Sequence, residues 1–279
     1  MSMTPFAPAL PAGACDTHLH IYEPARFPMA GPGTPPSQAG WSDYLALQAR
    51  LGLSRAVIVQ PVGYGPDNRC TLDALARAGG AARAVVACAP DIPAAQLQAW
   101  EALGVRGVRF MMVPGAQSWL GWDDLPRLAA RIAPLQWNIN LQLDGRSLPA
   151  YEAMLRALPC GVVIDHTGKF LEPVQTSHPG WHSLCRLLDS GRVWVKLSAP
   201  YETSRSGPPH YRDVGSLAAE LARRYPQRCL WASNWPHPGQ ARRPDEAGLL
   251  ALLHEWAGGK AGARRILVDN PAALYRFGD

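Results

Sequence analysis

The sequence has 279 residues, of which 47% are hydrophobic and 18% are charged. This length suits one α/β barrel domain or two small domains, and the apolar content excludes a disordered chain. The 26 glycines and 27 prolines follow no repeat period, so they exclude collagen and indicate many short loops.

The formal net charge is +5, and the basic residues are spread along the chain in runs no longer than a pair. A nucleic-acid site needs clustered basic residues, so we expect no nucleic-acid partner and favour an anionic small-molecule substrate. No segment approaches the ~20 apolar residues of a membrane span, and residues 1–13 lack the pattern of a signal peptide. We therefore expect a cytoplasmic protein without a membrane partner, whose six scattered cysteines are buried free thiols.

Short β-branched runs alternate with amphipathic stretches along the chain, which is typical of a parallel sheet with crossover helices. The predicted strands are Ala14–Ile21, Ala56–Pro61, Ala84–Cys88, Gly107–Met111, Trp137–Leu141, Gly161–Ile164, Val193–Leu197 and Cys229–Ala232. The predicted helices are Ser42–Leu51, Thr71–Ala78, Ala94–Leu103, Trp122–Ile132, Pro149–Leu158, Trp181–Asp189, Val214–Tyr225 and Pro244–Trp256. A last helix is predicted over Ala261–Val268, before a terminal turn that starts at Asn270 and Pro271.

Eight strands that are each followed by a helix predict an α/β protein with a single (β/α)8 TIM-type barrel over residues 1–279. An open, doubly wound sheet is the alternative, but such a sheet usually has fewer strands and a glycine-rich loop after its first strand. No linker divides the chain. The segment 24–40, rich in proline and glycine, is interpreted as a long loop over the active face after the first strand.

Polar residues stand where the predicted strands end, which in a barrel is the edge that carries the active site. The first strand ends in His18-Leu19-His20, and because residues i and i+2 of a strand point to the same side, both histidines face the barrel interior. The sixth apolar run is broken by Asp165-His166, and a charge buried there is costly unless it is used. The eighth strand is followed by Asn234-Trp235-Pro236-His237.

These motifs resemble the amidohydrolase superfamily, which has an HxH pair after strand one, Asp-His-x-Gly after strand six and an acid or amide before Trp-Pro-His after strand eight. The similarity covers nearly the whole chain and is greatest to the lactone-acting branch, which contains lactonases and lactone isomerases. The resemblance implies a (β/α)8 barrel and an enzyme of carbohydrate acid metabolism that acts on the ring ester of a small carboxylated lactone.

The resemblance also implies a ligand set. In metal-dependent members, a divalent cation is bound at the positions matched here by His18, His20, His166 and Asn234, whereas members of the lactone branch can work without metal and use an aspartate at the last position as general base. Asparagine is neither a base nor a good ligand for a hard cation. We therefore expect no metal and no cofactor, and the alternative is one zinc ion held by His18, His20 and His166.

Asn234 allows three interpretations. It is an engineered replacement of the aspartate, or part of a hydrolase in which a histidine such as His20 or His166 is the base, or part of an isomerase. In an isomerase the nucleophile is a hydroxyl of the substrate itself, so proximity supplies much of the acceleration. Asn234 would then orient that hydroxyl or bind the oxyanion.

Lactones of this branch carry free carboxylates, and a guanidinium binds a carboxylate through two parallel hydrogen bonds. Arg109, at the end of strand four, is the first candidate for this role, followed by Arg205 and Tyr201 in the loop after strand seven. The other predicted substrate-binding residues are Gln60, His237 and Lys169.

The leading hypothesis is a hydrolytic lactonase in which His18, His20 and His166 polarise the ring carbonyl while Asn234 occupies the position of the base. The first alternative is a cofactor-free isomerase of sugar-acid lactones. The second is a non-catalytic lactone-binding protein, which a ligand would stabilise without turnover.

Overall fold

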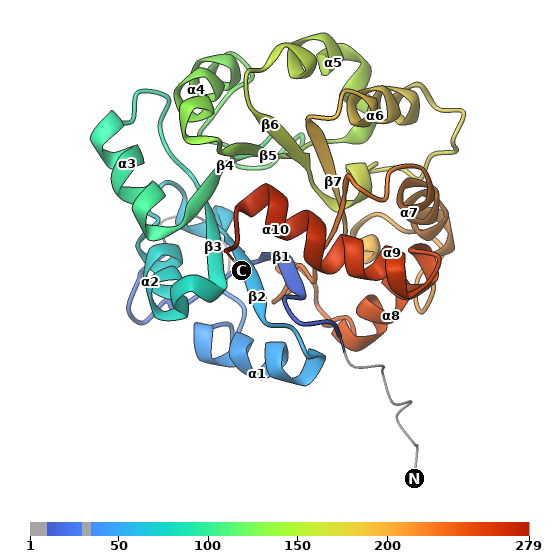
Figure 1. Cartoon of the computed structure of the whole chain (residues 1–279), viewed down its shortest axis with the longest axis horizontal. Coiled ribbons are helices and arrows are strands. Elements are labelled where there is room, and N and C mark those ends of the chain that lie inside the picture. The colour runs from blue at the N-terminus through green and yellow to red at the C-terminus, as the bar shows by residue number, and fades with distance from the viewer. Residues whose placement is uncertain (1–9, 30–34, 279) are drawn as a thin grey trace.

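Eight parallel strands form a ring that helices surround, and Figure 1 shows this ring end-on. The structure is a computed structural model that describes residues 10–29 and 35–278. Neighbouring strands pair in chain order: β1 (Cys15–Leu19), β2 (Arg55–Val59), β3 (Ala82–Val86), β4 (Val105–Met111), β5 (Asn138–Gln142), β6 (Gly161–Ile164), β7 (Val193–Leu197) and β8 (Cys229–Trp231). Each predicted strand is present with slightly different ends, so the predicted (β/α)8 barrel is confirmed.

A helix follows each strand and packs on the outside of the ring (Figure 1). The helices are α1 (Trp41–Leu51), α2 (Arg69–Ala78), α3 (Ala94–Leu103), α4 (Asp124–Ile132), α5 (Leu148–Ala157), α6 (Pro179–Asp189), α7 (Arg212–Arg224), α8 (Glu246–Trp256), α9 (Lys260–Arg264) and α10 (Asn270–Tyr275). Of the predicted loop over 24–40, residues 30–34 lie outside the described residues.

The predicted terminal turn at Asn270 is wrong, because these residues begin α10. A π-helical turn over Arg265–Asp269 joins α9 to α10 without a break. Pro271 lies in the first turn of α10, where its missing N–H would have no partner in the helix in any case. The sequence pattern therefore indicated a stop where the structure has only a change of helical pitch.

The outer core follows from helical periodicity. In α4 the buried residues are Leu125, Leu128, Ala129 and Ile132, at the spacing i, i+3, i+4 and i+7 that places them on one face. Burial of each large aliphatic side chain contributes roughly 1.5–3 kcal/mol relative to exposure. The strands contribute to this outer core as well: every second residue of a strand, such as Ala56 and Ile58 of β2, faces the helices.

The barrel interior is apolar at the amino ends of the strands. Inward residues there form one buried cluster with two side chains from the end of the chain: Cys15, Val57, Val59, Val85, Val163, Leu230, Tyr275 and Phe277. α10 crosses this end of the barrel in Figure 1, and the Arg83 side chain, from β3, donates to the carbonyl oxygens of Tyr275 and Arg276. Because this end is filled and covered, polar chemistry is confined to the opposite end.

The ring closes between β8 and β1 with the help of a side chain. The Asn234 N–H donates to the carbonyl of His18 at 2.9 Å, and the His20 N–H donates to that of Trp235 at 2.8 Å. Between them, the buried Asp16 carboxylate accepts the Ser233 N–H at 2.9 Å. Burial raises the pKa of Asp16 to about 6. In the described part of the chain, no helix is both long and apolar enough to span a membrane.

Candidate active site

His18, in β1, and His20, just after it, meet at the carboxyl end of the barrel. Nε2 of His18 lies 3.2 Å from Nε2 of His20, and Nδ1 of His20 lies 2.7 Å from the Val59 carbonyl oxygen. Because that carbonyl can only accept, Nδ1 of His20 carries the proton and its Nε2 presents a lone pair. His18 therefore donates from Nε2 and keeps a bare Nδ1. Burial holds the pKa of both rings well below the usual value, so both are neutral at pH 7.

Below the histidines lies a buried ion pair. Nζ of Lys196 is 2.9 Å from Nδ1 of His18, 2.7 Å from Oδ1 of Asn140 and 3.1 Å from Oδ1 of Asp165, and both charged side chains are fully buried. Asn140 also donates to the same Asp165 oxygen at 2.8 Å. Burial favours a neutral carboxyl, but the charge of Lys196 outweighs it and holds the pKa of Asp165 well below its usual value. Burial lowers the pKa of Lys196.

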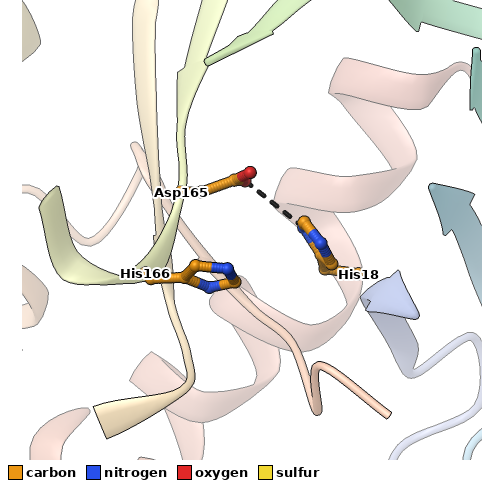
Figure 2. A group of neighbouring side chains, drawn as sticks. All are labelled: His18, Asp165 and His166. Carbon is orange, nitrogen blue, oxygen red and sulfur yellow. Dashed lines mark ion pairs between the residues drawn. The ribbon is translucent and has the colours of Figure 1, made fainter. Parts of the chain in front are cut away.

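His166 follows β6 and faces His18, with ring centroids 5.0 Å apart (Figure 2). Its Nδ1 lies 2.9 Å from the Ser198 hydroxyl, which follows β7. Burial lowers the pKa of His166 to about 3. Its backbone is left-handed with φ +54°, as are those of Asn234 at +59° and His237 at +63°. Residues other than glycine adopt this backbone conformation infrequently, and those that do cluster at active sites.

Asn234 is buried and donates both amide hydrogens. Its Nδ2 lies 2.9 Å from the Tyr201 hydroxyl and 2.9 Å from Oε1 of Glu202, whose other oxygen accepts from Lys169. Burial alone would raise the pKa of Glu202, but His166, Lys169 and the amide of Asn234 lower it. Residue 234 thus serves as a donor that stabilises a neighbouring carboxylate.

Two further residues that were predicted to bind substrate, His237 and Lys169, contact Tyr201 and Glu202. The Tyr201 hydroxyl is 2.8 Å from Nδ1 of the buried His237, whose Nε2 is 3.4 Å from Glu246. Since both ring nitrogens of His237 have partners, this histidine fixes the position of the Tyr201 hydroxyl. Lys169 is paired with Glu202.

Arg109 lies near the carboxyl end of β4 as a buried cation with unused hydrogen-bond donors. One terminal nitrogen donates to the Gln60 carbonyl at 2.6 Å and the other to the Gln142 side chain at 2.9 Å, while Nε has no partner among the described residues. Arg109 also lines a cavity of about 230 Å³ with mostly apolar walls, among them Val62, Met111 and Trp119. The site therefore offers a guanidinium at the edge of an apolar pocket.

The side chains of two other predicted binding residues have partners outside the buried network. Gln60 lines the same cavity as Arg109, and its side-chain amide donates to the carbonyls of Gly65 and Asp67 and accepts from Thr71. Arg205 is 72% exposed and pairs with Glu172, because the loop after β7 carries it outward. The structure does not bring Arg205 into the buried cluster.

Comparison with known proteins identifies the family. A family model described as "Amidohydrolase" matches residues 15–277. The chain belongs to the amidohydrolase family. D-galactarolactone isomerase of Agrobacterium fabrum is 35% identical, and the match covers 97% of this chain and 93% of the relative. "2-pyrone-4,6-dicarbaxylate hydrolase" of Comamonas testosteroni is also 35% identical, and the match covers 95% of this chain and 91% of the relative. An apo crystal structure from Agrobacterium tumefaciens superposes with a TM-score of 0.90 at 35% identity, over 97% of this chain and 98% of that one.

Whether a metal ion fits this amidohydrolase depends on the ligand atoms of His18, Asp165 and His166, which all lie within 4.8 Å of one another (Figure 2). Oδ2 of Asp165 is buried without a partner among the described residues, as a ligand atom would be. However, Lys196 contacts the Nδ1 of His18 and the other oxygen of Asp165, and the Nε2 of His18 faces His20. With the ammonium in place, the donor set does not fit a divalent cation, because the cation would face a buried positive charge.

Sequence reasoning did not single out Lys196, Asn140 or Glu202 as members of the amidohydrolase site. A signal existed for two of them: Lys196 and Asn140 are polar residues inside apolar strands, in positions that alternate with buried aliphatic residues. Glu202 gave no such signal, since it lies in a loop and only the fold brings it to Asn234.

Proposed function

We propose that this amidohydrolase isomerises small carboxylated lactones by transferring the ring acyl group to a hydroxyl of the same substrate, without a cofactor. The observation that carries the proposal is the amide at position 234, which donates to Tyr201 and Glu202 and has no basic atom to offer to water. The similarity to D-galactarolactone isomerase supports the same substrate class.

The reaction needs a proton acceptor, and His20 presents one. Its Nε2 lone pair takes the proton of the attacking hydroxyl, the hydroxyl oxygen bonds to the carbonyl carbon, the ring C–O bond breaks, and the same proton passes to the departing oxygen. No water is consumed. A ring nitrogen with a depressed pKa is a weak base. An internal nucleophile compensates, because effective molarities of oriented groups reach about 10⁵–10⁸ M.

The remaining roles follow from the donors at the site. When substrate binds, the Nε2–H of His18 turns from His20 to the carbonyl oxygen, which frees the Nε2 lone pair of His20 for the proton transfer, and His166 lies beside His18. Arg109 binds a substrate carboxylate through its unused N–H groups, while Tyr201 and Lys169 hold Asn234 and Glu202 in place. The apolar cavity beside Arg109 is not lined by the histidines or Asn234, so it would hold the part of the substrate that carries the carboxylate.

Hydrolysis is the second candidate, and Glu202 is the observation that favours it. A carboxylate at 2.9 Å from the Asn234 amide could activate water in place of the aspartate of the family pattern. The lowered pKa of Glu202 weakens it as a base. The similarity to the pyrone dicarboxylate hydrolase supports this reading.

The deciding experiment supplies D-galactarolactone and 2-pyrone-4,6-dicarboxylate in H₂¹⁸O, with and without chelator. A new ring size without acid release or ¹⁸O uptake supports isomerisation. Release of one labelled acid per turnover supports hydrolysis and refutes the isomerase proposal. Stabilisation of the protein without any product identifies a lactone-binding protein instead.

Arg109→Lys tests the carboxylate contact. We expect KM to rise by about 10- to 100-fold for a carboxylated lactone, which corresponds to the loss of one charged hydrogen bond. The matched control is D-glucono-1,5-lactone, which has hydroxyls for the internal transfer but no carboxylate, and its kcat/KM is expected to stay unchanged. An equal loss for both lactones would contradict the assignment.

A further inference from the structure

Lys196 is a cation that the proposed reaction does not use. It is one of three lysines in the sequence, and its side chain is fully buried in the barrel. Its three contacts, to Nδ1 of His18, Oδ1 of Asn140 and Oδ1 of Asp165, lie at 2.9, 2.7 and 3.1 Å. Three acceptors match the three N–H bonds of an ammonium, so the group is fully coordinated by the protein.

The same contacts connect the ammonium to the group of side chains that could hold a metal. His18 and Asp165 are two of the three residues whose ligand atoms lie within 4.8 Å, and His166 is the third. Carboxylate and imidazole are ordinary ligands of divalent zinc. Lys196 takes one atom from each of the first two ligands and balances the buried charge of Asp165.

We propose that the Lys196 ammonium permanently replaces a divalent metal in this barrel, and that removing its charge converts His18, Asp165 and His166 into a zinc site. Without the ammonium, Nδ1 of His18 is released, Oδ1 of Asp165 keeps only the Asn140 amide, and Oδ2 of Asp165 has no partner among the described residues. His166 is the third residue of the group. The charge of the buried carboxylate then requires a new cation. This inference goes beyond the proposed function, since it does not depend on which lactone reacts.

The test is zinc binding by the full-length chain after treatment with chelator. The variants are Lys196→Gln and Lys196→Met, which remove the charge and keep much of the side-chain volume. Zinc affinity is measured by competition with a chromophoric chelator, and bound zinc is counted by elemental analysis. Lys260→Gln is the matched control, because it removes a lysine charge far along the sequence at the start of α9.

We expect the wild-type chain and Lys260→Gln to retain no zinc. Lys196→Gln should bind one zinc per chain at least about a hundredfold more tightly than the wild type, because changes to residues that contact metal ligands alter metal affinity by up to about that factor. Zinc should raise the Tm of Lys196→Gln, and adding His166→Ala should abolish both effects. If the Lys196 variants unfold without metal, zinc should restore their circular dichroism, because the binding energy then supports folding.

Two results would overturn the proposal. One is stoichiometric zinc in the wild-type chain that His166→Ala removes, which would show that Lys196 does not exclude the metal. The other is a folded Lys196→Gln whose affinity for zinc equals that of the wild type. Neither result decides whether the lactone is isomerised or hydrolysed, which the labelled-water assay tests separately.

Discussion

Replacing Asn234 by aspartate tests the electrostatics of the proposed site directly. In the wild type, the Asn234 amide donates to Oε1 of Glu202 at 2.9 Å. Asn234→Asp replaces that donor by a second carboxylate. Two buried carboxylates at such a distance cannot both ionise freely, so the pair is expected to share one proton near neutral pH.

The size of the effect follows from the separation. Two unit charges about 4 Å apart repel by roughly 1 kcal/mol in bulk water and roughly 4 kcal/mol at an effective dielectric constant of about 20. At 1.36 kcal/mol per pKa unit, this raises one apparent pKa of the pair by about 1–3 units. Lys169, which is paired with Glu202, offsets part of the repulsion. The second carboxylate should therefore lose its proton between about pH 5 and pH 7.

The assay is acid release from a carboxylated lactone as a function of pH. Above its apparent pKa the new carboxylate can act as a general base, so hydrolysis by Asn234→Asp should rise by about 100-fold or more over the wild type. The control is the double variant Asn234→Asp/Glu202→Gln, which restores one amide and one carboxylate with their positions exchanged. Its hydrolysis should begin at lower pH, because the repulsion is gone.

Identical pH profiles for the single and double variants would refute the reasoning, since the two carboxylates would then not interact. A single variant that folds but releases no acid at any pH would refute the idea that position 234 faces the reacting carbonyl.

Three further outcomes are expected. Asp16 has a pKa of about 6 in the folded protein against an ordinary value of 3.8. Its contribution to the free energy of unfolding is therefore complete below pH 3.8 and is lost as the pH rises through 6, by up to about 3 kcal/mol. Denaturant titrations at several pH values should show this loss in the wild type, and Asp16→Asn should lack it. Gly180→Ala would place Cβ 2.4 Å from the Gly145 carbonyl oxygen and should destabilise the protein by about 1–3 kcal/mol. Gly80→Ala is the control, because its Cβ would meet no atom of the described residues within 4 Å, and equal losses of stability would contradict the packing. His20→Gln should lower kcat by about 10²–10⁴ without unfolding the chain, and an unchanged kcat would remove His20 as proton acceptor.

The sequence alone determined the barrel, because the alternation of strand and helix patterns is a local property. It also identified the two histidines of β1, since residues i and i+2 of a strand share a side. The observed contact between Nε2 of His18 and Nε2 of His20, at 3.2 Å, agrees with that expectation. The six cysteines are all buried and free, as their scattered positions in apolar runs suggested.

The tertiary structure decided which polar side chains meet. Lys196 and His18 are 178 residues apart in sequence, and Asn234 and Glu202 come from different loops, so no local pattern could join them. A sequence pattern also does not give the direction of an exposed side chain: the loop after β7 carries Arg205 outward, where it pairs with Glu172. A pattern fixes which face of a strand is buried, whereas the choice of partner in a buried network depends on register and loop path, which only the closed barrel defines.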